Sequence, residues 1–486
     1  MPFLGHGLCD LYMQHRLLPI PVEFIHLLGW AWVALEVAFF ALVMLSWLPT
    51  INIRTKTPEY KMSPEELITK VLDMVKMVPG YDMETFISGW FLGAPFSEVK
   101  KDNLVEFICW AMYNKDFRHA TPEESAAMGR KLAEFQQCFP RDFEEGYNPK
   151  VSCTKFTLED AASHIIHRPL VFYVMVSVFR MLGSALLHLT GFMYYTEGEM
   201  AYWYRPSARP AGALEPLPLV FFHGISPGLM VYLAVIRHLV SGRSALLVDM
   251  RHVGMGLDMR PPSREQTLRD IRAAFRRHGF TRACVAGHSY GSVCAGWMAA
   301  DTPELVAQLV LLDPVCLLLA CPDVAYNFLY RKPKTLMEFL VHHAATEIGI
   351  ANTLRRHFWW FNNCLWLEDI AKEVPVVVHL AENDEVVPVD LVRKYLEGVA
   401  ADREGVVVEE VVANKDGRSS PRSVAPSHAI DVMWSKGYSH GQLLYSFNTQ
   451  KELATRVFLQ EARLAMQGDS DDEVVKKPSR AGDARR

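Results

Sequence analysis

The chain has 486 residues, of which 50% are apolar, and it carries 50 basic against 55 acidic side chains. A length of this order holds one large domain together with substantial additions. The formal net charge of -5 argues against nucleic acid as a main partner, because proteins that bind phosphate backbones are usually basic.

The nine cysteines show neither a CxxC pair nor a Cys/His spacing typical of a metal site. An odd number without such spacing favours reduced, buried thiols facing the cytosol over a disulfide framework.

The first predicted element is an apolar helix over residues 27–48. Its 22 residues form a helix of about 33 Å, enough to cross a bilayer core of about 30 Å. Trp30, Trp32 and Trp47 lie near its ends, as interfacial aromatics do. Glu36 opposes insertion by roughly 2–3 kcal/mol, which the other side chains can offset. We therefore predict a membrane anchor over 1–62, with a buried helix of a soluble domain as the alternative.

Basic residues are more frequent after this segment than before it. Arg54, Lys56 and Lys61 follow it, whereas only Arg16 precedes it. Because positive charge is retained on the cytoplasmic side, we expect a single-pass protein whose bulk faces the cytosol.

Residues 63–194 are predicted to form a helical region. Two helix starts, at Ser63 and at Thr121, each place a capping hydroxyl before proline and two glutamates. The region is read as helical to about residue 166. It contains no chemical motif, so we interpret it as a collar or adaptor.

A second apolar run covers 169–194 and is interrupted by Arg180 and His188. These polar side chains favour a helix that lies in the membrane plane or packs on the following domain. A spanning helix is the alternative.

From about Tyr195 short β-rich runs alternate with helices such as 264–278, a pattern typical of an α/β sheet. The candidate strands are 217–222, 245–249, 283–286, 306–312, 374–380 and 406–412. An aromatic-rich insertion over about 315–370 interrupts the alternation. We predict a doubly wound, mostly parallel sheet in a domain covering 195–467, with 315–370 as an inserted helical segment. The charged residues 468–486 are predicted to form a disordered tail.

The pentapeptide 287–291, Gly-His-Ser-Tyr-Gly, lies between an apolar strand and a run of small apolar residues. A G-x-S-x-G motif between a strand and a helix is a nucleophile elbow, which holds the serine in strained backbone angles. The flanking glycines are needed because side chains there would collide with the neighbouring strand and helix. Ser289 is the predicted nucleophile.

A serine hydroxyl needs a base to take its proton and a carboxylate to orient that base, in the order serine, acid, histidine. Asp384 follows the buried strand 374–380 and is the predicted acid. The rival carboxylates are Glu382, Glu385, Asp390 and Asp313.

His440 lies on a loop just before an apolar helix start and is the predicted base. His428, at the end of a loop rich in proline and serine, is its rival.

The developing oxyanion requires two backbone donors. One is the N–H of Tyr290, immediately after the nucleophile. We assign the other to the N–H of Ile225, which follows His223-Gly224 at the end of an earlier strand.

In residues 200–465, the ordered set of His223-Gly224, the segment 249–254, the pentapeptide 287–291, Asp384 and His440 resembles the α/β-hydrolase superfamily. The resemblance implies Ser289 as nucleophile, His440 as base, Asp384 as acid and 315–370 as a cap over the pocket. The match is looser where members often carry Arg-Gly rather than Arg251-His252, and over 413–439.

A serine at 289 speaks against the members with an aspartate nucleophile, such as epoxide hydrolases and dehalogenases. The resemblance implies a serine esterase or lipase, and the apolar segment 27–48 with the aromatic insertion predicts that it is membrane-anchored and acts on a lipophilic ester. Neither a metal nor an organic cofactor is called for. An acyltransferase and a catalytically inactive interaction module are the alternatives. The sequence leaves protein partners unknown.

Overall fold

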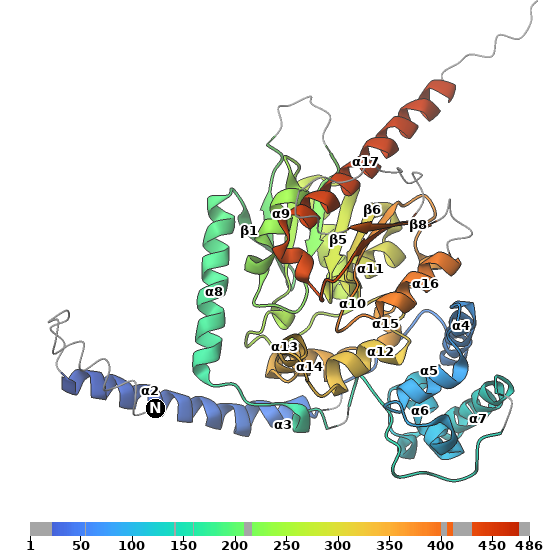
Figure 1. Cartoon of the computed structure of the whole chain (residues 1–486). Coiled ribbons are helices and arrows are strands. Elements are labelled where there is room, and N and C mark those ends of the chain that lie inside the picture. The colour runs from blue at the N-terminus through green and yellow to red at the C-terminus, as the bar shows by residue number, and fades with distance from the viewer. Residues whose placement is uncertain are drawn as a thin grey trace, which may run out of the picture.

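The computed structural model describes residues 22–53, 55–139, 142–158, 160–208, 216–399, 406–411 and 430–475. Its centre is a nine-stranded sheet in the order β1-β2-β4-β3-β5-β6-β7-β9-β8 (Figure 1). The strands are β1 Met193–Glu197, β2 Met200–Arg205, β3 Leu219–Phe222, β4 Ala245–Asp249, β5 Ala283–His288, β6 Val306–Leu312, β7 Val376–Ala381, β8 Val406–Val411 and β9 Ile430–Ser435.

The sheet is parallel except for β1 and β2, which pair antiparallel with their neighbours. In β5, β6 and β7 every residue is buried, as expected of parallel strands covered on both faces. Their register pairs His288 with Leu312 and Leu312 with His379. The loops after these three strands therefore meet at one edge of the sheet.

Helices cover both faces of the sheet (Figure 1). Helices α10 Arg264–His278, α11 Gly291–Asp301 and α16 Val389–Val399 share one hydrophobic core with one face. Helices α9 Leu233–Val240 and α17 Phe447–Val475 share a second core with the other face. This is the doubly wound arrangement that the sequence predicts.

The inserted segment between β6 and β7 is helical, as predicted, and lies beyond the carboxyl ends of the strands. It contains α12 Pro322–Ala325, α13 Leu336–Ala345, α14 Ile348–Arg356 and α15 Trp360–Asn363. We call residues 315–370 the cap.

The N-terminal helices form a bundle that packs on the cap. They are α4 Pro64–Met77, α5 Met83–Trp90, α6 Lys101–Tyr113 and α7 Pro122–Gln137. Ser63 and Thr121 form the predicted N-caps, each within a complete capping box. The cap side chain Trp360 donates from Nε1 to the carbonyl of Ala111 at 3.2 Å, which ties α15 to α6.

Two helices are long and apolar enough to cross a membrane, Val22–Ile51 and Leu170–Leu189, although core helices of soluble proteins pass the same test. The first comprises α2 Val22–Leu42, a π-helical turn and α3 Leu48–Ile51, and the second is α8 Leu170–Leu189. Glu36 of α2 accepts the backbone N–H groups of Leu170 at 2.7 Å and Val171 at 3.1 Å. Its carboxylate therefore caps the N-terminus of α8, where negative charge is stabilising.

Several elements differ from the sequence-based expectations. The strands β1, β2 and β9 were not predicted, and Tyr194 belongs to β1 rather than to the second apolar run. The helical reading of 63–166 holds only to Gln137, beyond which the described chain is mostly irregular. Helix α17 continues to Val475 and so extends into the segment predicted as a tail.

Candidate active site

Ser289 follows β5 directly and precedes α11, in the turn that the motif predicts. Its φ of 52° lies in the left-handed region, which side chains rarely adopt. A Cβ on Gly287 would lie 2.5 Å from the carbonyl oxygen of Gly291, and a Cβ on Gly291 would overlap the carbonyl of Phe222. The two glycines are thus required by the close approach of strand and helix backbones.

Replacing Gly291 by alanine is expected to lower the free energy of unfolding by about 3 kcal/mol or more, because the new methyl group overlaps a backbone carbonyl. The matched control is Gly129→Ala in α7, where no atom lies within 4 Å. That change should raise the free energy of unfolding by up to about 1 kcal/mol. Chemical unfolding followed by circular dichroism measures both free energies. Equal effects would contradict the close approach of the Gly291 and Phe222 backbones.

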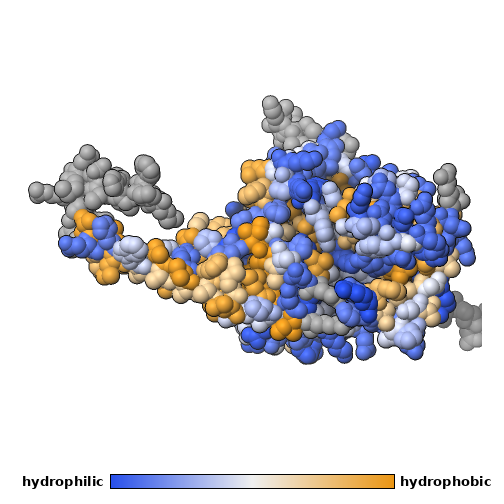
Figure 2. All heavy atoms as spheres, turned by 90° about the horizontal axis from the view of Figure 1, so that it is seen from below, coloured by the Kyte–Doolittle hydropathy of each residue, from blue (hydrophilic) through white to orange (hydrophobic). Residues whose placement is uncertain are grey.

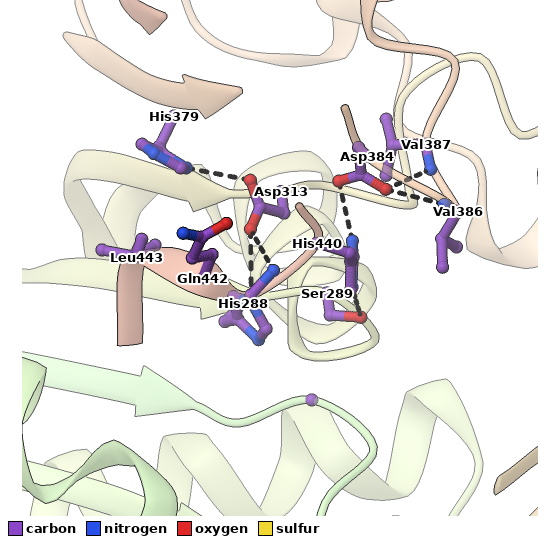
Figure 3. Close-up of polar contacts among 12 residues, drawn as sticks. His288, Ser289, Asp313, His379, Asp384, Val386, Val387, His440, Gln442 and Leu443 are labelled. Carbon is purple, nitrogen blue, oxygen red and sulfur yellow. Dashed lines mark hydrogen bonds and ion pairs between the residues drawn. The ribbon is translucent and has the colours of Figure 1, made fainter. Parts of the chain in front are cut away.

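The structure brings Ser289, His440 and Asp384 together (Figure 3). The Nε2 atom of His440 lies 2.9 Å from Ser289 Oγ, and its Nδ1 lies 2.7 Å from Asp384 Oδ2. The other carboxylate oxygen of Asp384 accepts the N–H groups of Val386 and Val387, each at 2.7 Å. Since a carboxylate only accepts, Nδ1 carries a proton, and when the ring is neutral Nε2 can receive the one on Ser289.

The surroundings of His440 favour the protonated form of its ring. Burial disfavours its charged form, but the adjacent Asp384 carboxylate outweighs burial and raises the pKa of His440 to about 9. The Asp384 carboxylate would therefore stabilise the imidazolium that forms when His440 takes a proton from Ser289.

The rival acids have other partners. Glu385 accepts the backbone N–H of His440 at 3.0 Å, and Glu382 accepts that of Gly437 at 2.8 Å. Asp390 lies in the first turn of α16. The rival base His428 lies outside the described residues.

Asp313 is close to the site but does not bond the His440 ring. Its Oδ2 accepts the N–H of Gly441 at 2.9 Å, and its Oδ1 accepts Nδ1–H of His379, also at 2.9 Å. Burial acts to raise the pKa of Asp313, but the His379 and His288 imidazoles hold it well below its usual range.

A buried polar network surrounds Asp313, and sequence reasoning missed it. The Nε2 atom of His379 lies 2.9 Å from Ser435 Oγ, and His288 Nε2 lies 3.6 Å from Asp313 Oδ2. On its other side His288 Nδ1 lies 3.0 Å from the Tyr232 hydroxyl. The network thus joins the ends of β5, β6, β7 and β9.

The same carboxylates could be considered as metal ligands. The ligating atoms of Asp313, Asp384 and His440 lie within 4.8 Å of one another. A metal there would compete with the hydrogen bonds from His379, Gly441 and the His440 ring, which already use these oxygens. This donor set therefore fits hydrogen bonding to imidazoles better than it fits an ion.

The predicted oxyanion donors lie beside Ser289. Within the described part of the chain, the N–H groups of Ile225 and Tyr290 donate to no protein acceptor. A Cβ on Gly224 would lie 2.8 Å from Ser289 Cβ, so only glycine lets this loop approach the serine so closely. Gly224 N–H donates to the Tyr232 hydroxyl at 2.8 Å, which fixes the loop.

The adjoining His223 has a supporting role. Its Nε2 accepts the N–H of Met250 at 2.9 Å, so its Nδ1–H donates to the carbonyl of Gly224 at 2.7 Å. Burial lowers the pKa of His223 to about 4, and the ring stays neutral. It therefore orients the donor loop without adding charge.

An apolar pocket opens on Ser289, Ile225 and Tyr290. The cap contributes six side chains to it: Val315, Val324, Phe328, Leu329, Leu354 and Phe358. The remaining wall includes Phe156, from the end of the N-terminal region, which sequence reasoning did not place there. The volume open to a water-sized sphere is only about 30 Å³.

A larger cavity of about 340 Å³ lies between the N-terminal helices and the cap, with Lys115, Lys155 and Arg356 in its wall. Ser289 does not line this cavity. We therefore take the smaller pocket as the candidate site, since it alone of the two contains the serine.

Comparison with known proteins matches residues 218–354 to the alpha/beta hydrolase fold family. No curated protein is found to match the sequence. Among solved structures, a bacterial membrane phospholipase A is 15% identical, with a TM-score of 0.39. The alignment covers 60% of this chain and 92% of the phospholipase chain.

A carboxylesterase from Bacillus subtilis is 15% identical, with a TM-score of 0.35, over 58% of this chain and 96% of its own. The enol-lactonase from Burkholderia xenovorans is 13% identical, with a TM-score of 0.36, over 55% of this chain and 100% of its own. The strand order and the matched family together establish that the chain has the α/β-hydrolase fold.

Proposed function

We propose that this protein is a serine hydrolase that cleaves carboxylic esters through an acyl-enzyme. The observation that carries the proposal is the continuous hydrogen-bonded line from Ser289 Oγ through the His440 ring to Asp384. Hydroxyl, imidazole and carboxylate in this order are the parts that activate a serine for acyl transfer.

In the proposed reaction His440 Nε2 takes the Ser289 proton while Oγ attacks the ester carbonyl carbon. The carbonyl oxygen becomes an oxyanion that receives the N–H groups of Ile225 and Tyr290. His440 then gives its proton to the leaving alcohol as the C–O bond breaks. A water molecule, deprotonated by the same ring, attacks the acyl-enzyme and releases the acid.

We propose a lipophilic acyl group as the substrate portion bound in the pocket. Its walls are aromatic and aliphatic apart from the serine and the backbone donors. Pockets for drug-sized ligands usually hold about 300–1,000 Å³, far more than the free space here. A long acyl chain therefore enters only when cap side chains such as Phe328 and Phe358 move aside.

The proposal includes a membrane anchor. The described residues 22–35 of α2 are exposed on every side, although most of them are apolar. A helix that is apolar all round is normally surrounded by protein or by lipid. We propose that residues 22–35 of α2 insert into a bilayer and that Arg54, Lys56 and Lys61 keep the hydrolase domain on the cytosolic side.

Labelling with a fluorophosphonate probe tests the nucleophile. The probe should bond to Ser289 Oγ with loss of fluoride, and the Ser289→Ala protein should take up none. The exposed serine at 163 supplies the control, since Ser163→Ala should be labelled as strongly as the unmodified protein. Mass spectrometry of the labelled peptide identifies the site. An unlabelled native protein would favour the inactive scaffold, and undiminished labelling of Ser289→Ala would rule out this nucleophile.

A further inference from the structure

Helix α8 has two long faces of different kinds. One face is buried against the hydrolase domain through Tyr173, Val176, Gly183 and Leu187. The opposite face is apolar and exposed along the whole helix. It presents Val171, Val174, Val178, Met181, Leu182 and Leu189. These positions recur at helical spacing and form one stripe, which we call the α8 stripe.

The buried face fixes α8 to the domain at several points. Arg180 Nη2 donates to the two carboxylate oxygens of Asp249 at 2.9 and 3.1 Å. A Cβ on Gly183 would lie 2.8 Å from Met230 Cβ, and the Tyr173 hydroxyl donates to Glu347 at 2.9 Å. Helix α8 could cross a bilayer on its own only if all these contacts were broken.

The orientation of α8 relative to α2 follows from Glu36. The first N–H groups of a helix point along its axis, and those of Leu170 and Val171 point at Glu36 on the flank of α2. Helix α8 therefore starts beside α2 and runs away from it, across its direction (Figure 1). If α2 enters a bilayer end first, α8 lies along the surface of that bilayer.

The projecting part of α2 indicates whether lipid or protein covers the exposed faces of these helices. The 14 residues 22–35 extend for about 21 Å and are exposed all round. Apolar surface runs along this projecting helix in the space-filling view (Figure 2). A bilayer covers every side of such a helix, whereas a protein partner could do so only by enclosing it completely.

We propose that the α8 stripe is a second membrane contact, lying in the plane of the bilayer surface that α2 enters. The hydrolase domain is then held against the membrane along α8 rather than tethered by α2 alone. Glu36, at the junction of the two helices, sits at the level of the lipid head groups instead of the hydrocarbon centre. This inference rests on the proposed membrane anchor and is independent of the ester chemistry.

Two methionines provide a matched test. Met181 in the α8 stripe is 69% exposed, and Met466 near the end of α17 is 68% exposed. Each is changed to cysteine in the full chain and labelled with a polarity-sensitive dye, with the unmodified protein as the blank for native thiols. The proteins are reconstituted in phosphatidylcholine vesicles with and without nitroxide-bearing lipid.

The dye at Met181→Cys is expected to emit at shorter wavelength in vesicles and to be quenched by the nitroxide lipid, whereas the dye at Met466→Cys should do neither. Equal responses at the two positions would overturn the inference. A blue shift that depends on protein concentration and ignores the nitroxide would overturn it too, and would identify the covering partner as a second copy of this chain.

A charge substitution gives an independent readout. Met181→Glu is expected to slow hydrolysis of a vesicle-embedded ester several-fold, because a carboxylate on the stripe opposes contact with lipid. Hydrolysis of a water-soluble ester should stay within about twofold, and Met466→Glu should alter neither rate. If the unmodified protein hydrolyses no ester but the Met181 dye responds, the proposed function fails while this inference stands. Equal effects of the two glutamates on the vesicle ester would count against the α8 contact.

Discussion

Ser289→Ala and His440→Ala are each expected to reduce kcat/KM for a soluble short-chain ester by about 10⁴–10⁶-fold, and the double variant should be no worse than either single one. The hydroxyl is reactive only when the ring takes its proton, and the ring has no other task once the hydroxyl is gone. A loss of 10⁴ corresponds to about 5.4 kcal/mol of activation barrier. Both side chains are therefore expected to act as one unit.

Release of a chromogenic alcohol measures these rates, and the thermal midpoint of each variant checks that its fold is retained. Ser163→Ala is the control, since this serine lies outside the pocket and should leave kcat/KM unchanged. If the losses of the single variants multiply in the double variant, the two side chains act separately and the acyl-enzyme mechanism is wrong.

Asp384→Asn is expected to lower kcat/KM by about 10⁴-fold, because an amide no longer fixes the His440 tautomer or stabilises its charge. Asp313→Asn should affect stability more than catalysis, although the Asp313 carboxylate lies within 4.8 Å of the Asp384 carboxylate. The substitution weakens a fully buried hydrogen bond of His379 and should lower the free energy of unfolding by about 1–3 kcal/mol, with a much smaller effect on kcat/KM. Comparable kinetic losses in the two variants would mean that Asp313 shares the catalytic role.

The pH profile separates the same two carboxylates. His440 accepts a proton only when its ring is neutral, so kcat/KM should rise with pH and level off above about 9. Asp384→Asn removes the main charge that raises this pKa, which leaves burial to lower it, and the rise should move to lower pH. The shift in Asp313→Asn should be smaller, because Asp313 does not bond the ring. Identical profiles in all three proteins would contradict the assignment of the rising limb to His440.

The sequence predicted the elements whose signals are local. The turn at Ser289 depends on five consecutive residues, and the buried strands 245–249 and 306–312 are mostly apolar runs that the structure reproduces. Strand β9 escaped prediction because Asp431 interrupts its apolar run. The carboxylate is paired with Arg456 of α17 at 2.5 Å, a long-range contact that the sequence does not display.

The buried network around Asp313 could not be predicted from the sequence for a related reason. Its members come from the ends of four strands, and only the parallel register places His379 and Ser435 beside Asp313. The single local signal was the Leu-Asp-Pro sequence after β6, which made Asp313 a rival acid. Its left-handed φ of 43° fits a side chain held by tertiary hydrogen bonds rather than by its own turn.

Phe156 shows that the N-terminal region and the domain with the sheet contribute side chains to the same pocket. It precedes the first residue of β3 by more than 60 residues, yet it forms part of the wall around Ser289 and contacts Phe358 at a tilt, with ring centroids 5.1 Å apart. A C-terminal fragment without Phe156 would have a gap in this wall of the pocket, which would admit larger molecules and water. If Ser289 acts as proposed, the selectivity of the pocket depends on both regions, and a substitution in one region limits which substitutions the other can accept.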